Sequence, residues 1–126
     1  MGKFLAIGLG GFFGAVLRYW ISEWVFELFK GRFPAGTLTV NLIGSFVLGL
    51  LMAVFENYPL HPLQPNIKFF LATGLLGAFT TFSTFSFETL VLLQAGSVGK
   101  AALNILLSVC IGIAAALAGY GLGKYM

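Results

Sequence analysis

The stretch Gly77-Ala-Phe-Thr-Thr-Phe-Ser-Thr-Phe-Ser-Phe-Glu88 combines one glycine, five hydroxyl side chains, four phenylalanines and a carboxylate within a long apolar segment. Hydrocarbon offers polar side chains no hydrogen bonds, so membrane segments tolerate them only where they face protein or water. We therefore expect this segment to cross a membrane and to line a path through the protein.

The composition of the whole chain agrees with a membrane location. The 126 residues are 59% hydrophobic and 9% charged, whereas a soluble domain carries about 25% charged residues. Four apolar stretches, at about residues 4–29, 37–55, 67–93 and 98–123, each reach the roughly 18–20 residues that span a bilayer as a helix. None has a polar face at the helical period. We predict an all-α membrane protein with four transmembrane helices in a single domain over residues 1–126.

The third stretch is predicted to be broken near its middle. Gly77 and the β-branched pair Thr80-Thr81 weaken a helix at this point. At 100° per residue, Thr84 and Glu88 share a face, with Phe85 beside them and Phe82 the next aromatic round. A break frees backbone carbonyls, which inside a membrane need hydroxyls, another chain or a cation as partners.

The basic residues that flank the four stretches are evenly divided. An even number of spans puts both termini on one side with Lys3, Lys68 and Lys124, and leaves Lys30, Arg32 and Lys100 on the other. This balance gives no positive-inside preference. Either it reflects where the span boundaries are drawn, or the chain inserts in both orientations and two copies pair antiparallel. Pairing would also supply protein surface for the polar residues of so small a bundle.

Other features allow more than one interpretation. Arg18 either extends to the membrane interface among Tyr19, Trp20 and Trp24, or attracts anions at a water-filled mouth. Asn41 either links neighbouring helices or presents its two N–H donors to an ion. Small residues four apart let helices approach closely in lipid, and they occur at Gly10/Gly14, Ser45/Gly49 and Gly119/Gly123.

The chain lacks the residues of an enzyme or a nucleic-acid-binding protein. It has a single histidine, His61, in a Pro-rich turn, no aspartate, and no metal-ligand or nucleophile–base spacing. Its net charge of +3 comes from scattered basic residues rather than a cluster. Cys110 is its only cysteine, so an intramolecular disulfide is impossible and an apolar packing role is expected.

Two motifs together resemble a known family. Gly36-Thr-Leu-Thr-Val-Asn41-Leu-Ile-Gly44 and the stretch from Gly77 to Glu88 closely resemble the Fluc (CrcB) family of microbial fluoride channels, and the resemblance covers essentially the whole chain. It implies an antiparallel, dual-topology homodimer with two fluoride pores in the inner or plasma membrane. Such a channel lets fluoride leave the cell passively, which lowers cytoplasmic fluoride and gives resistance to it.

The resemblance also implies roles for individual residues. Asn41 would lie on the fluoride path and Arg18 at its vestibule, while Phe82 and Phe85 would present their ring edges to the ion. The family's hydroxyl track maps to Thr81, Ser83, Thr84 and Ser86. The backbone carbonyls of Gly77 and Thr80 from both subunits would hold a structural sodium ion. In the fourth helix, relatives carry Tyr and two Ser where this chain has Asn104, Ser108 and Gly112, so only Ser108 matches as a lining residue.

The chemistry of fluoride is consistent with these assignments. A selective pore must replace its tightly held water with compact donors, and amide protons, hydroxyls and phenyl ring edges can do so. We expect Glu88 to hydrogen-bond a neighbouring hydroxyl rather than face the ion. Two alternatives remain: a proton-coupled exporter of the small multidrug resistance type, with Glu88 as its membrane carboxylate, and a structural subunit without a transport role.

Overall fold

The computed structural model describes residues 1–58 and 64–126, and every regular element in these ranges is helical. The predicted turn around His61 lies outside the described residues. The elements are, in chain order, α1 (Gly2–Leu28), α2 (Ala35–Asn57), α3 (Gln64–Lys68), η1 (Phe69–Leu76), α4 (Gly77–Phe79), α5 (Phe82–Gln94), α6 (Val98–Leu106), η2 (Leu107–Ile111) and α7 (Gly112–Lys124), where η denotes a π-helical segment.

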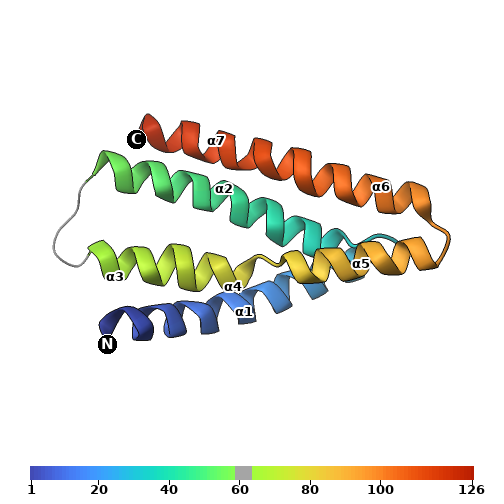
Figure 1. The fold of residues 1–126 in the computed structure, drawn as a ribbon, viewed down its shortest axis with the longest axis horizontal. Helices are drawn as coiled ribbons and strands as arrows, with labels where there is room; N and C mark the ends of the chain where they lie inside the picture. The colour runs from blue at the N-terminus through green and yellow to red at the C-terminus, as the bar shows by residue number, and fades with distance from the viewer. Residues whose placement is uncertain (59–63) are drawn as a thin grey trace.

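These elements join end to end into long helical rods, of which α3, η1, α4 and α5 together form the third rod (Figure 1). Within the described residues, four helices are long and apolar enough to cross a membrane: Gly2–Leu28, Ala35–Asn57, Pro65–Gln94 and Val98–Lys124. The predicted all-α fold with four membrane-crossing helices is confirmed. Both termini lie at the same end of the bundle as the start of α3, and the α1–α2 and α5–α6 connections lie at the opposite end (Figure 1). At that opposite end the Lys100 ammonium donates to the Arg32 carbonyl, 3.3 Å away.

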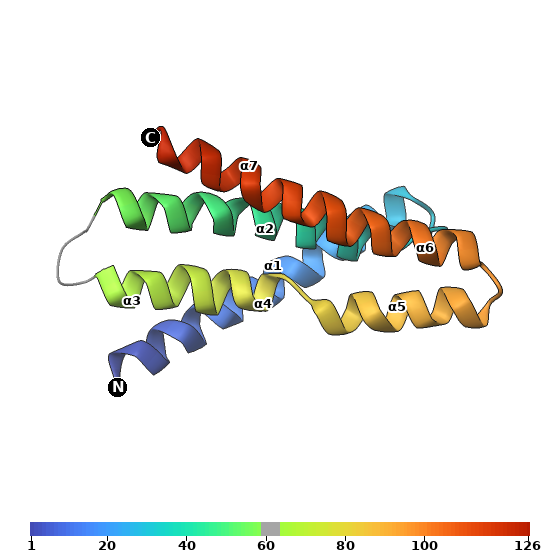
Figure 2. The same cartoon turned by 45° about the horizontal axis from the view of Figure 1, so that its top comes forward.

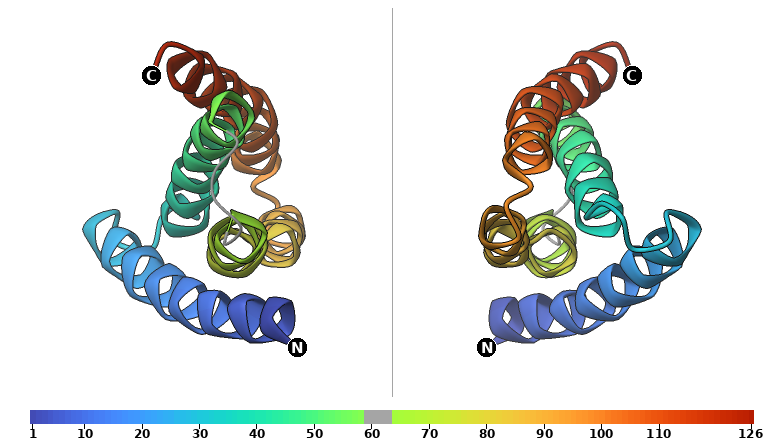
Figure 3. Two further views of the ribbon diagram at one scale, coloured as in Figure 1. Left: turned by 90° about the vertical axis from the view of Figure 1, so that its left-hand side faces the viewer. Right: turned by 90° about the vertical axis from the view of Figure 1, so that its right-hand side faces the viewer.

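Glycines allow the rods to pack backbone against backbone. A Cβ atom built at Gly14 of α1 would lie 2.1 Å from the Leu75 carbonyl oxygen of η1, and one built at Gly119 of α7 would lie 2.0 Å from the Phe46 carbonyl oxygen of α2. Figure 3 shows these two pairings end on, with α1 below the third rod and α2 beside α7. The small-residue pairs Gly10/Gly14 and Gly119/Gly123 therefore serve contacts within one chain.

Between α4 and α5 the backbone is extended rather than helical. Thr80 has φ −88° and ψ 157°, and Thr81 has φ −151° and ψ 116°. Figure 2 shows the chain stepping sideways here, so that α5 continues beside α6 rather than in line with α4. The Thr81 hydroxyl oxygen accepts a hydrogen bond from the Thr84 N–H, which makes Thr81 the N-cap of α5.

The buried core is small and the exterior is apolar. Val40, Leu76 and Phe79 form a buried cluster beside the extended segment. Large apolar side chains such as Phe12, Trp24 and Leu117 are exposed, the last to 67%. An apolar exterior of this kind is stable in hydrocarbon, where helices associate through close packing and not through burial from water.

Candidate functional site

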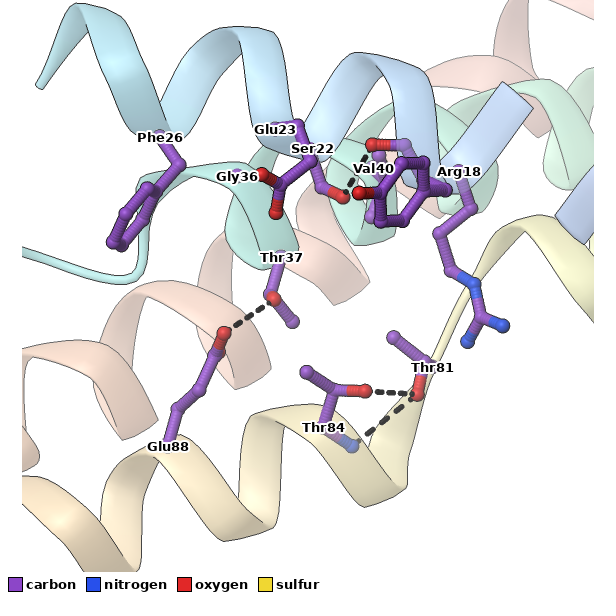
Figure 4. Close-up of a pocket in the computed structure, with 11 residues that line it drawn as sticks. Arg18, Ser22, Glu23, Phe26, Gly36, Thr37, Val40, Thr81, Thr84 and Glu88 are labelled. Atoms are coloured by element: carbon purple, nitrogen blue, oxygen red, sulfur yellow. Dashed lines mark hydrogen bonds between the residues drawn. The ribbon is translucent and has the colours of Figure 1, made fainter. Parts of the chain in front are cut away.

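Two cavities lie on either side of the extended segment at Thr80 and Thr81. The first, of about 370 Å³, is bordered by α1, α2 and α5 and contains Arg18, Thr37 and Glu88; we call it the Arg18 cavity (Figure 4). The second, of about 300 Å³, is bordered by α2, η1, α5 and η2 and contains Asn41 and Phe85; we call it the Phe85 cavity. Thr81 lines both cavities. Some of the predicted polar residues, Arg18, Asn41 and Ser108, therefore border cavities that share Thr81.

Asn41 is bound to the backbone of Thr81 by both ends of its amide. The Thr81 N–H donates to Asn41 Oδ1 at 2.8 Å, and Asn41 Nδ2 donates to the Thr81 carbonyl at 3.1 Å. One amide proton of Asn41 is used in this way, and the amide carries two. Both interpretations of Asn41 thus have a structural counterpart: the side chain links α2 to the third rod and also lines the Phe85 cavity.

The hydroxyl groups at the start of α5 form a local cluster. Thr81 Oγ1 lies 3.0 Å from Thr84 Oγ1 and 3.2 Å from Ser83 Oγ. Thr84 borders the Arg18 cavity, whereas Ser83 is exposed and borders neither cavity. Ser86 is also exposed, and its hydroxyl donates to the Phe82 carbonyl at 2.9 Å. The four hydroxyl residues of the track therefore have different surroundings within one chain.

The two phenylalanines of the predicted path lie side by side at the Phe85 cavity. Their ring centroids are 5.5 Å apart with the planes tilted by 50°. Phe85 is buried, whereas 78% of the Phe82 surface is exposed in the single chain. Ser108 lines the same cavity from η2, and its hydroxyl oxygen is buried without a hydrogen-bond partner among the described residues.

Glu88 has the hydroxyl partner that we expected. Thr37 of α2 donates to Glu88 Oε1 at 2.8 Å, and this bond crosses the Arg18 cavity in Figure 4. In the described part of the chain, Glu88 Oε2 is buried without a partner. Arg18 extends from α1 toward Thr81 in the same view. Its guanidinium therefore lies at a polar cavity within the bundle.

The carbonyl groups of Gly77 and Thr80 lose their helical donors. In a regular helix they would accept from the N–H groups of residues 81 and 84. Here the Thr81 N–H donates to Asn41 and the Thr84 N–H donates to the Thr81 hydroxyl. Gly77 is exposed on the single chain. The carbonyl oxygens of Gly77 and Thr80 can therefore accept from, or coordinate, a group outside this helix.

Several contacts of the site were not predicted. Sequence spacing does not identify Thr37 as the partner of Glu88 or connect Thr89 with the site. Thr89 is buried, donates to the Phe85 carbonyl at 2.7 Å and accepts from Asn104 Nδ2 at 3.0 Å. Asn104, expected on one face with Ser108, is buried against α5 and does not line the Phe85 cavity. Each of these residues is a polar side chain inside a predicted membrane span, and this is the sequence feature that could have indicated it.

Among the described residues, no group of three or more His, Cys, Asp or Glu side chains could hold a metal ion. The polar groups of the site are amides, hydroxyls, one guanidinium and one carboxylate held by a hydroxyl. Such a set can bind and orient a small ion.

Four membrane-crossing helices with these polar groups inside the bundle define a multi-pass integral membrane protein. The family model described as "CrcB-like protein, Camphor Resistance (CrcB)" matches residues 5–120, and the chain belongs to this family.

Curated relatives extend along nearly the whole chain. A protein of Sulfurovum sp. (strain NBC37-1) is 48% identical over 95% of this chain and 92% of its own length. One of Vibrio parahaemolyticus is 49% identical over 97% of both chains, and one of Campylobacter jejuni is 47% identical over 92% of this chain and 93% of its own. All three are named "Fluoride-specific ion channel FluC". This name is that of an ion channel and not of an enzyme.

Proposed function

We propose that this protein is a fluoride-selective ion channel that lets fluoride cross the membrane passively. Its membership of the CrcB family and the names of its relatives support the proposal. The observation that carries it is the gathering of donors at Thr81, which borders both cavities and is bound by the Asn41 amide. Net flow is outward whenever fluoride is more concentrated inside the cell, so the channel lowers cytoplasmic fluoride and gives fluoride resistance.

The start of α5 supports an anion rather than a cation as the permeating ion. α5 begins at Phe82, within the bundle, and carries 13 residues. The N-terminus of a helix bears a partial positive charge, and it stabilises anions most where water is scarce. Arg18 adds a full positive charge at the neighbouring cavity. In the same cavity one oxygen of the Glu88 carboxyl group accepts the hydrogen bond from Thr37.

We place the fluoride path along Asn41, Phe82, Phe85 and Ser108, with the hydroxyls of Thr81, Ser83 and Thr84 nearby and Arg18 at the vestibule. The free amide proton of Asn41 and the Ser108 hydroxyl are compact donors at the Phe85 cavity. The tilted phenyl rings offer electropositive edges beside them. Such donors can replace the water of a small, tightly hydrated anion.

We propose that two copies pair antiparallel, each pair having two pores. Phe82 is 78% exposed on the single chain, and the Gly77 and Thr80 carbonyls lack their regular donors. The carbonyls need a partner inside a membrane, and the second copy would also cover the Phe82 ring, which borders the same cavity. The flanking basic residues are balanced between the two ends, which favours insertion in both orientations.

A structural sodium ion fits the carbonyls of Gly77 and Thr80. Hard cations prefer oxygen ligands, and these oxygens are released because Thr81 and Thr84 direct their N–H groups elsewhere. One chain supplies two oxygens, so the second copy would complete the set. The ion would neutralise the partial negative charges of these carbonyls and hold the two copies together.

The proposal is tested by fluoride efflux from liposomes that contain the purified protein. We expect fluoride to leave without any proton gradient, at a rate proportional to the amount of protein, while chloride is retained. Equal fluxes of chloride and fluoride would refute selectivity. Flux that requires a pH gradient would favour a proton-coupled exporter with Glu88 as its carboxylate, and no flux at all would favour a structural subunit.

A further inference from the structure

A buried pair of polar side chains connects α6 to α5 next to the Phe85 cavity. Asn104 of α6 is 1% exposed and donates from Nδ2 to Thr89 Oγ1 at 3.0 Å. The Thr89 hydroxyl in turn donates to the Phe85 carbonyl at 2.7 Å. The three groups thus form a continuous series of hydrogen bonds from α6, through the Thr89 hydroxyl, to the backbone of Phe85, whose ring lines the cavity.

Because these hydrogen bonds are buried, the loss of either one is costly to stability. Ala101, one turn before Asn104, is also 1% exposed, so α6 lies close against its neighbours here. Within a membrane bundle no water replaces a lost bond. A hydroxyl that both accepts and donates is polarised, so its two bonds strengthen each other.

The series of hydrogen bonds ends at the Phe85 carbonyl, so it acts on this residue in addition to stabilising the protein. A threonine hydroxyl that bonds the carbonyl four residues earlier adds a second donor to that carbonyl and bends the helix locally. In α5 this carbonyl belongs to Phe85, whose ring packs against Phe82. A bend caused by this bond would act on the turn that carries the aromatic side chain of the cavity.

We propose that Asn104 and Thr89 are positioning residues that fix the Phe85 ring in the Phe85 cavity, an inference that rests on the proposed fluoride path. Asn104 acts by anchoring the Thr89 hydroxyl, and Thr89 acts on the Phe85 carbonyl. Neither side chain contacts the ion.

Two substitutions at position 89 separate the hydroxyl from side-chain volume. Thr89→Val keeps the shape and removes the hydroxyl, whereas Thr89→Ser keeps the hydroxyl. We expect Thr89→Val to lower fluoride flux per assembled protein by about three- to tenfold, the range that corresponds to one lost hydrogen bond, and Thr89→Ser to restore most of it. Thr73→Val, which removes an exposed hydroxyl of η1 outside both cavities, is the matched control and should leave flux unchanged.

A double variant distinguishes positioning from stability. Thr89→Val leaves the Asn104 amide buried without its partner, which lowers the unfolding temperature. Asn104→Leu, of similar volume, removes that amide. We expect the double variant Thr89→Val/Asn104→Leu to regain stability relative to Thr89→Val while its flux stays low. Flux that returns together with stability would mean that the pair is merely structural, and would overturn the proposal.

A readout independent of flux is the ¹⁹F NMR signal of 4-fluorophenylalanine incorporated at position 85. We expect the Thr89→Ser signal to match that of the parent, and the Thr89→Val and Asn104→Leu signals to shift or broaden. An unchanged signal in both of these variants would refute positioning. If the parent protein conducts no fluoride, the proposed channel fails, but the signal still decides whether Asn104 and Thr89 hold the Phe85 ring.

Discussion

Replacing Asn41 by Asp tests the centre of the proposed path. The substitution keeps an oxygen that can accept the Thr81 N–H, now 2.8 Å from Asn41 Oδ1. It removes the amide nitrogen that donates to the Thr81 carbonyl at 3.1 Å. An oxygen in its place would face the carbonyl oxygen without a proton between them, and a negative charge would enter the Phe85 cavity, which Asn41 lines.

The lost hydrogen bond lowers stability and the new negative charge lowers flux, each by an amount that follows from the structure. The carbonyl that loses its donor is partly buried, so the variant should lose about 1–3 kcal/mol of stability. An anion about 4 Å from the new carboxylate would be repelled by about 4 kcal/mol at an effective dielectric constant of about 20. Because about 1.4 kcal/mol is a factor of ten, fluoride flux should fall about a thousandfold.

The assay is fluoride efflux from liposomes, normalised to the assembled protein measured by size-exclusion chromatography. Asn57→Asp is the matched control: Asn57 is also on α2 and donates from its amide to the carbonyls of Gly123 and Lys124, both at 3.2 Å, but it borders neither cavity. Because Asn57 is exposed and water can replace its bonds, this variant should cost less stability, and it should leave flux unchanged. Wild-type flux from assembled Asn41→Asp would show that Asn41 only links helices, and an equal flux loss in Asn57→Asp would show that the effect is not local.

Three further predictions follow from the same structure. Phe85→Ile keeps most of the bulk but loses the electropositive ring edge, so efflux should fall at least about tenfold; efflux at the parent rate would make this ring a packing residue. A cysteine at exposed Ala95, in a Cys110→Ser background, should be labelled about equally from both sides of the membrane, and labelling from one side alone would exclude dual topology. Gly119→Ala should destabilise the protein in detergent by about 1–3 kcal/mol because its Cβ would lie 2.0 Å from a carbonyl oxygen, whereas Gly121→Ala, with nothing within 4 Å, should be neutral or stabilising; equal melting temperatures would refute the packing argument.

Some features of this protein follow from local sequence alone. The four membrane-crossing helices are predicted by the length of the apolar stretches, because the thickness of a bilayer sets a minimum that each stretch reaches. The weak point of the third helix is indicated by Gly77 and by the adjacent threonines, whose backbone and side-chain preferences act within a few residues. The position of both termini at one end of the bundle follows from an even number of spans.

Which polar groups meet was decided by tertiary structure. Thr37 and Glu88, 51 residues apart, and Asn41 and Thr81, 40 residues apart, are joined because α2 packs beside the third rod at one particular rotation. The π-helical segment η1 lies within the third rod and changes which residues of that rod face α2, since a π-helical turn departs from the period of 3.6 residues.

Asn104 shows the same limit most clearly. Its spacing from Ser108 predicts that both residues lie on one face of an α-helix. In the structure Ser108 belongs to the π-helical segment η2 and lines the Phe85 cavity, while Asn104 of α6 is buried against α5 and bonded to Thr89. Sequence periodicity defines the face of a helix but not the neighbour that covers each turn of it. The sequence by itself therefore determined how many times the chain crosses the membrane and where the third helix is weakened. Which donors line a cavity was decided only by the packing of helices that are distant in the chain. Each of these hydrogen bonds depends on a close approach of two helices, which local preferences do not determine.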